Sequence, residues 1–275
     1  MTDFGIKDGN VGVMKGVILG IAPHAQIVDL SHTISPQNIE EAALVLARSA
    51  PYFPPATVHV VVVDPGVGTA RRHIAARLGE QYYVCPDNGI LTLLLERAET
   101  EGWPVEIVHT NNPEYWLPVV SHVFHGRDIF SPVAAHLASG VSLGALGAPI
   151  QDPVRLSLPR PQRTASGWRG EVIHIDHFGN ISTNLRVEHL GERLPSIEMR
   201  LCGVNIHGMV RTFGERPPGE LVALYGSTGN LIVSVVNGNA AQRLNAKVGD
   251  LVEVQVASSC LACGKAGEGK FKVDL

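Results

Sequence analysis

Cysteine is scarce and the net charge is small in this chain of 275 residues, and each excludes a class of protein. Four cysteines are too few and too widely spaced for the disulfide framework of a small secreted protein. Charged residues make up 17% of the chain and hydrophobic residues 45%, which excludes a largely disordered protein. The net charge of −4, from 22 basic and 26 acidic residues, argues against a nucleic-acid partner, because phosphate binding needs clustered lysine and arginine.

Long apolar runs are absent as well. No stretch approaches the roughly 20 apolar residues that cross a bilayer, and no charged-then-apolar leader opens the chain. We therefore expect no membrane partner and a cytoplasmic location. The CxxC spacing of Cys260 and Cys263 lacks the second pair that a structural zinc requires, and HExxH spacing is absent. The sequence therefore predicts no metal, although it leaves a metal-dependent hydrolase possible.

The first half of the chain alternates strand and helix patterns. Residues 57–63, TVHVVVV, form a β-branched run typical of a strand buried on both faces of a parallel sheet, and a second strand is expected over 81–85. Helical spacing recurs over 11–21, 39–46, 90–97 and 130–138. This alternation predicts an α/β N-terminal domain over residues 1–155, with a mainly parallel sheet flanked by helices.

The pattern changes at residues 156–168, which are rich in proline, arginine and serine and are expected to form a linker. Beyond them the expected strands are short and separated by turns: 170–175, 197–201, 221–225, 231–236 and 251–256. No long helical pattern intervenes, so residues 169–257 are predicted to form a smaller all-β, barrel-like C-terminal domain. Residues 258–275 are small, glycine-rich and basic, and we expect a loose tail.

Asp64 stands where the strand over 57–63 ends, in the segment DPGVGT, with Arg71 just beyond. Ligands of open α/β sheets bind outside the carboxyl ends of strands, and the glycines would let the backbone approach a ligand closely. Asp, Pro and Gly are also the usual residues of a surface turn. Judged alone, this segment is more often an inert turn than a site.

A second candidate is His125, in the segment FHGRD ahead of the helix over 130–138. Histidine suits proton transfer or the orientation of water. Asp128 could instead begin the helix as its N-cap, with Arg127 as an ion-pair partner. At the N-terminus, Asp3 and Asp8 could bind ribose hydroxyls, or could favour the positive end of the first helix dipole.

Two turns in the second half carry polar candidates. Asp176, Phe178 and Asn180 lie in IDHFGN, which could hold an amino-acid zwitterion and stack a base, or form a plain hairpin loop. Ser227 lies in GSTGN, whose amides could face a carboxylate. No segment matches a P-loop or GxGxxG, so we predict no phosphate or dinucleotide site.

Taken in order, these segments resemble the S-adenosyl-L-methionine (SAM) hydroxide adenosyltransferase family, the SAM hydrolases, which are related to the fluorinases and chlorinases. The matching segments are TDFG at 2–5, VDPGVGT at 63–69, PDNG at 86–89, FHGRD at 124–128, IDHFGNISTN at 175–184 and GSTGN at 226–230. The resemblance implies an N-terminal α/β domain, a C-terminal β-barrel-like domain and a homotrimer that holds SAM between neighbouring subunits.

The resemblance also implies roles for individual residues. Those implied to position and activate water are Asp64, Arg71 and His125. Those implied to bind the substrate are Asp3 with Asp8 nearby (ribose), Asn88 in the PDNG turn, Asp176 and Asn180 (methionine amino group), Phe178 (packed against the substrate) and Ser227 (carboxylate).

The implied reaction is attack of water or hydroxide at C5′ of the adenosyl group, giving adenosine and L-methionine, with SAM as the substrate and no cofactor. The related halogenases carry a tyrosine where Asp64 stands, and a carboxylate there would repel a halide while accepting a proton from water. Gly126 also lacks the hydroxyl that a halide site would use. The alternatives are a halogenase-like SAM-dependent adenosyl transferase, a non-catalytic SAM or adenosine sensor, and a metal-dependent nucleoside hydrolase.

Overall fold

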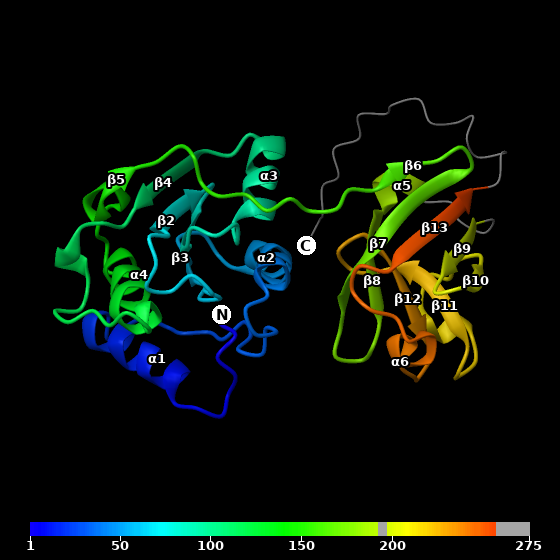
Figure 1. Ribbon diagram of the computed structural model, residues 1–275, viewed down its shortest axis with the longest axis horizontal. Coiled ribbons are helices and arrows are strands. Elements are labelled where there is room, and N and C mark those ends of the chain that lie inside the picture. Colours follow the sequence, from blue (N-terminus) through cyan, green and yellow to red (C-terminus); the bar gives the residue numbers. More distant parts are fainter. Residues whose placement is uncertain (192–196, 257–275) are drawn as a thin grey trace. The chain divides into compact units, whose positions relative to one another are not determined.

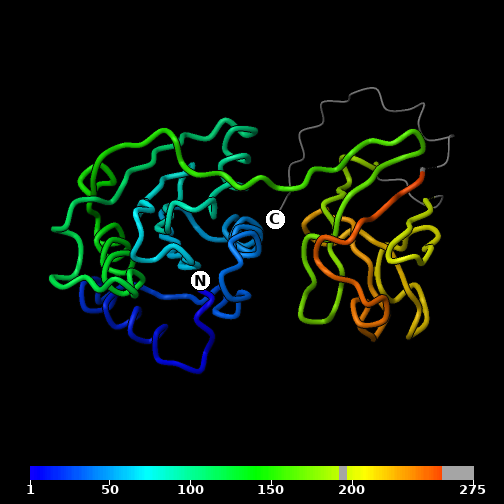
Figure 2. Tube along the Cα trace, viewed as in Figure 1, coloured from blue at the N-terminus to red at the C-terminus, as the bar shows by residue number. Residues whose placement is uncertain are grey.

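The computed structural model describes residues 1–191 and 197–256. The chain divides after Leu158 into two compact units, unit 1 from Met1 and unit 2 from Pro159. Figures 1 and 2 follow the chain through unit 1, in blue to green, and then through unit 2, in green to red. The expected tail over 258–275, with its CxxC pair, lies outside the described residues. Within them, no helix is both long and apolar enough to span a membrane.

A five-stranded sheet forms the centre of unit 1, in the order β1-β3-β2-β4-β5. Its strands are β1 (Val58–Val60), β2 (His73–Leu78), β3 (Gln81–Pro86), β4 (Val105–His109) and β5 (Ala148–Pro149). Only the β1–β3 pairing in this order is parallel; the other three are antiparallel. The expected mainly parallel sheet is therefore wrong: the sheet is mixed, because the short turn at Gly79 joins β2 to β3 as a hairpin.

Four helices cover the two faces of this sheet: α1 (Asn10–Ile21), α2 (Ile39–Ser49), α3 (Thr92–Glu101) and α4 (Ser131–Ala138). Helices α2 and α3 pack on one face, and α1 and α4 on the other (Figure 1). Successive residues of an extended segment point to opposite faces of the sheet. Val61 and Val63 therefore pack in the core beneath α2 and α3, while Val62 packs in the core beneath α1 and α4. Burial on both faces explains the run of four valines over 60–63.

Asn38 shows how local sequence sets a boundary. Its side chain accepts a hydrogen bond from the Glu41 backbone N–H at 2.9 Å and so caps α2. The Glu41 carboxylate accepts from the Ser35 N–H at 3.0 Å, which ties the preceding loop to the start of the helix.

Unit 2 is an antiparallel sheet in the order β10-β9-β13-β7-β8-β12-β11, with β6 paired to β7. Its elements are β6 (Gln162–Arg163), β7 (Gly167–Ile175), β8 (Ile181–Arg186), α5 (Val187–Leu190), β9 (Ile197–Leu201), β10 (Val204–His207), β11 (Leu221–Tyr225), β12 (Asn230–Val235), α6 (Ala240–Leu244) and β13 (Leu251–Val256). The N–H of Val210, after β10, donates to the carbonyl of Ala223 in β11 at 3.0 Å. This bond joins the two ends of the sheet and nearly closes it, which confirms the barrel-like expectation.

One core group of unit 1 is a buried histidine. His59 on β1 is 5% exposed, stacks on Tyr83 with ring centroids 5.0 Å apart, and places Nε2 3.3 Å from Gln81 Oε1. Burial lowers the pKa of His59 to about 4. The folded protein therefore holds this ring neutral where an unfolded chain would protonate it.

We expect the free energy of unfolding to fall as pH drops from about 6.5 to about 4, since only the unfolded state binds the His59 proton in this window. Urea unfolding at a series of pH values measures the slope, which should be shallower in His59→Gln than in wild type. His24→Gln removes an exposed histidine and should keep the wild-type slope. Equal slopes in wild type and His59→Gln would contradict the account.

Candidate active site

The parallel segments of unit 1 end at one edge of the sheet, and acidic and amide side chains follow each of them. Thr2 forms a parallel bridge with Val62, and β1 runs parallel to β3. Asp3, Asp64 and Asn88 follow these three segments. The carboxyl edge of parallel strands is where open α/β sheets bind ligands.

Asp64 and Arg71 form a bidentate ion pair at this edge. Arg71 Nε lies 2.8 Å from Asp64 Oδ1, and Nη2 donates to Oδ2. The two side chains are 10% and 5% exposed for Arg71 and Asp64, so solvent screens the pair little. The turn between them needs glycine: Gly68 has φ +77°, and a Cβ there would lie 2.3 Å from the His122 carbonyl oxygen.

His125 reaches the same guanidinium from a distant segment. Its Nδ1 lies 2.9 Å from Arg71 Nη2. It directly precedes the π-helical turn Gly126–Phe130, which leads into α4, and such turns are frequent at functional sites. Burial first, and then the positive charge of Arg71, lowers the pKa of His125, so the ring is neutral at neutral pH. The structure thus brings Asp64, Arg71 and His125 together.

Asp128 supports the loop that leads to His125. It is fully buried, and its Oδ2 accepts from the Ser121 N–H at 2.9 Å while Arg127 Nε lies 2.6 Å from Oδ1. The ion pair with Arg127 considered from the sequence is present. The helix N-cap role is wrong, because Asp128 lies inside the π-helical turn and binds a residue that precedes it.

The other candidates in unit 1 lie in different surroundings. Asp3 Oδ2 accepts from the Gln37 N–H at 2.7 Å. Asn88 Nδ2 donates to the Val63 carbonyl at 2.9 Å, so this amide ties the PDNG turn to the strand that carries Asp64. Asp8 is exposed ahead of α1.

In unit 2, Asp176 organises the β7–β8 turn. Its Oδ1 accepts from the backbone N–H groups of Phe178 at 2.9 Å and Asn180 at 2.8 Å, and its Oδ2 accepts from Asn180 Nδ2 at 2.7 Å. Phe178 is 72% exposed. The turn thus presents an aromatic ring on a loop whose shape the carboxylate fixes.

Ser227 is not brought to that turn. In the β8–β12 ladder, Ile181 lies opposite Val233 and Arg186 opposite Asn230, so the Ser227 turn is at the other end. At about 3.3 Å per residue the separation along the ladder is roughly 15–20 Å. The amino and carboxylate groups of an amino acid share one carbon, so the two turns of a single copy lie too far apart to hold both groups of one amino acid.

The residue that sequence reasoning missed is His73, whose Nε2 lies 3.2 Å from His125 Nδ1. It comes two residues after Arg71, the spacing that puts strand residues on one face. This spacing indicates that the two side chains lie on the same side only if the segment HIAARL is known to be a strand. Asp87 was also missed: it is buried, pairs with Arg72 at 2.7 Å and accepts from the Val154 N–H at 2.8 Å.

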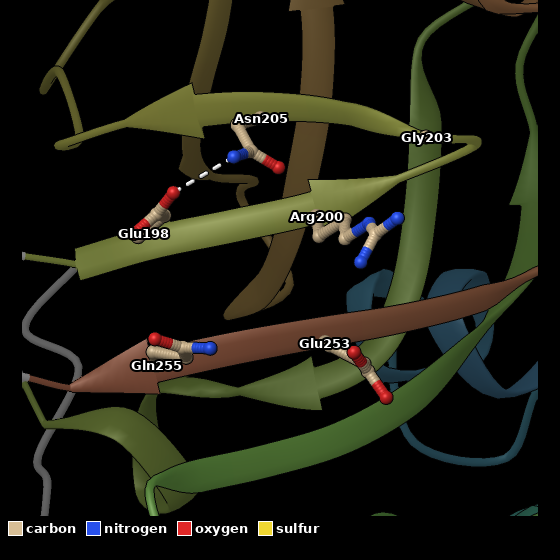
Figure 3. A pocket seen from close by; sticks show the side chains of 6 residues that line it. All are labelled: Glu198, Arg200, Gly203, Asn205, Glu253 and Gln255. Carbon is tan, nitrogen blue, oxygen red and sulfur yellow. Dashed lines mark hydrogen bonds between the residues drawn. The ribbon is translucent and has the colours of Figure 1, made fainter.

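A hollow of about 530 Å³ lies elsewhere, on β9, β10 and β13 of unit 2. Figure 3 shows its lining: Glu198, Arg200, Gly203, Asn205, Glu253 and Gln255. Asn205 Nδ2 donates to Glu198 Oε1 at 2.9 Å across it. None of the candidate residues lines this hollow. Over residues 1–191 and 197–256, no three His, Cys, Asp or Glu side chains are grouped to hold a metal ion.

Two family models match the chain. The SAM hydroxide adenosyltransferase N-terminal domain matches residues 1–147, and the C-terminal domain of the same family matches residues 170–253. The (R)-S-adenosyl-L-methionine hydrolase of Salinispora tropica is 41% identical over 257 residues, which cover 92% of this chain and 95% of the relative. A fluorinase from an Actinoplanes species is 30% identical over 212 residues, 67% of this chain and 70% of the relative.

Among solved structures, an uncharacterized conserved protein from Thermotoga maritima is similar, with a TM-score of 0.86 and 38% sequence identity. The match covers 93% of this chain and 98% of that one.

Asp128→Ala should lower the free energy of unfolding by about 2–3 kcal/mol, because it leaves the Ser121 N–H and the Arg127 guanidinium without their buried acceptor. Urea unfolding checks this. Asp152→Ala removes a carboxylate that is 80% exposed and should stay within about 0.5 kcal/mol of wild type. Equal losses in the two variants would count against the structural role of Asp128.

Proposed function

Because the chain belongs to the SAM hydroxide adenosyltransferase family, we propose that it hydrolyses S-adenosyl-L-methionine to adenosine and L-methionine. The observation that carries the proposal is the cluster of Asp64, Arg71 and His125 at the carboxyl edge of the sheet. A nearly buried guanidinium that contacts both a carboxylate and an imidazole suits the binding and activation of one water molecule.

The reaction is an in-line displacement. The oxygen of water or hydroxide bonds to C5′, and the C5′–S bond breaks with its electron pair moving to sulfur. The sulfonium becomes the neutral thioether of methionine, so the leaving group needs no proton and the demand falls on the nucleophile. The Asp64 carboxylate accepts the hydrogen of the attacking water, while the fixed charge of Arg71 stabilises the negative charge of the carboxylate and of the developing hydroxide.

For the substrate, we assign the ribose hydroxyls to Asp3, at the edge that carries Asp64, with Asp8 nearby. We propose that the turn of Asp176, Phe178 and Asn180 and the turn of Ser227 contact separate parts of SAM, which their positions at opposite ends of the β8–β12 ladder support. SAM is the substrate, and the reaction as written needs no cofactor or metal. The net charge of −4 suits a cytoplasmic enzyme that binds no nucleic acid.

A halide-dependent adenosyl transferase is the second candidate, favoured by the fluorinase relative. The Asp64 carboxylate opposes it, because a negative group at the nucleophile position repels a halide and favours a hydrogen-bond donor such as water.

Incubation with SAM, followed by chromatography of the nucleoside products, separates the two candidates. We expect adenosine and methionine in equal amounts, with the same yield whether chloride, fluoride or neither is added. A 5′-halogenated adenosine would establish the second candidate. Tight SAM binding without turnover would indicate a sensor, and loss of activity with a chelator would indicate a metal-dependent hydrolase.

Asp64→Asn should lower kcat at least 100-fold with little change in SAM affinity, because the amide keeps the shape but cannot take the proton of water. Steady-state kinetics and calorimetric titration measure the two effects. Asp152→Asn, at an exposed carboxylate, is the matched control and should behave as wild type. Retention of kcat in Asp64→Asn would remove Asp64 from the reaction.

The proposed assembly is a homotrimer with SAM between neighbouring subunits. The composition and exposure of helix α1 support this assembly. Lys15 is the one charged residue of the helix, and Met14 is the one residue of the helix that the described chain buries. Val13 and Leu19 are 44% and 43% exposed. A helix that is apolar nearly all round is normally buried, which supports an interface that covers it.

Light scattering after size-exclusion chromatography should give three times the mass of one chain. Leu19→Glu, which puts a charge on the apolar face of α1, should lower that mass. Ser49→Glu, at the end of α2, serves as the control and should keep it. A wild-type mass of one chain at micromolar concentration would contradict the trimer.

A further inference from the structure

His73 is the first residue of β2 and lies beside Arg71 and His125, two of the candidate catalytic residues. Its Nε2 lies 3.2 Å from His125 Nδ1. Its ring meets Trp116 edge-on at 5.6 Å between centroids and Phe130 edge-on at 5.8 Å. Aromatic rings on two sides therefore hold the imidazole in place, independently of its contact with His125.

The contact with Arg71 settles which nitrogen of His125 carries the proton. A guanidinium only donates hydrogen bonds, so His125 Nδ1, 2.9 Å from Arg71 Nη2, must be an acceptor without a hydrogen. Since the ring is neutral, its proton is on Nε2.

The same reasoning fixes the tautomer of His73. Its Nε2 faces the bare Nδ1 of His125, and two bare nitrogens at 3.2 Å would set lone pair against lone pair. His73 Nε2 therefore carries a hydrogen and donates it. Burial, then the charge of Arg71, lowers the pKa of His73 to about 3, so the ring is neutral and its Nδ1 is bare. Among the described residues this Nδ1 is buried without a hydrogen-bond partner, which costs less for a bare acceptor than for an N–H.

We propose that His73 is a positioning residue that, with Arg71, supplies two hydrogen bonds to His125 Nδ1 and so fixes His125 with its Nε2–H directed away from both donors. The proposal rests on the proposed function for its catalytic meaning. The proposal gives His125 and Asp64 different roles toward the nucleophile. His125 donates a hydrogen bond to the water or hydroxide oxygen, and the proton of water goes to Asp64. His125 then orients the nucleophile and is not its base.

The ring tautomers can be read without substrate from long-range 1H–15N correlation spectra of protein labelled at histidine. Signals are assigned through their loss in His73→Gln and His125→Asn. We expect His125 to show a protonated Nε2 and an Nδ1 that accepts hydrogen bonds, and His73 to show a protonated Nε2. A proton on Nδ1 of either ring in the wild-type protein overturns the inference; the variants serve only to assign the signals.

Three variants at position 73 test the consequence. His73→Leu removes the donor, and should shift the His125 Nδ1 resonance and lower kcat about two- to tenfold, with KM within twofold. His73→Gln places an amide N–H near the former Nε2 and should restore both the resonance and kcat. His73→Asn places its N–H near the former Nδ1 and should behave like His73→Leu.

An unchanged His125 Nδ1 resonance in His73→Leu, or equal kcat in His73→Leu and His73→Gln, would overturn the positioning role. Failure of the proposed function is distinguishable, because it shows as an absence of adenosine while the wild-type tautomers are as stated.

Discussion

The ion pair between Asp64 and Arg71 is the interaction on which the rest of the site depends. Two contacts join the carboxylate to the Nε–Nη2 edge of the guanidinium, and the remaining hydrogen of Nη2 reaches His125. One cation therefore sets the direction of a carboxylate and the tautomer of an imidazole at once. Because the side chains are nearly buried, these directions are held by geometry and not averaged by solvent.

The fold supplies this arrangement through the edge of a sheet. The strand that ends at Asp64 is buried on both faces, which fixes where its carboxyl end lies. A glycine turn returns the chain to Arg71, and Asn88 ties the next turn to the same strand end. The π-helical turn that follows His125, and the hydrogen bond from the Ser121 N–H to the buried Asp128, position His125 against Arg71. Each part is a rigid element or a loop anchored by a buried polar group.

Much of this could be predicted from the sequence. The order of short motifs pointed to the family, and the apolar run before Asp64 placed that carboxylate at a strand end. The mixed sheet could not be predicted from the sequence, because β2 contains Ala75 and Ala76 where β-branched residues would have indicated a strand. Without β2, the alternation that puts Arg71 and His73 on one side was invisible.

Pairing register was the second limit. Asp176 and Ser227 both lie in polar turns of the β unit, and nothing local in either turn shows that the β8–β12 ladder separates them. Register depends on contacts between strands far apart in the chain, so it becomes known only from the structure.

The source of the 5′-oxygen of adenosine shows whether a water molecule held by Asp64, Arg71 and His125 attacks C5′ of SAM. Turnover in 18O-labelled water, followed by mass spectrometry of both products, identifies that source. We expect one 18O atom per adenosine, at the 5′-oxygen, and none in methionine. Unlabelled adenosine, or label in methionine alone, would contradict the attack of water at C5′.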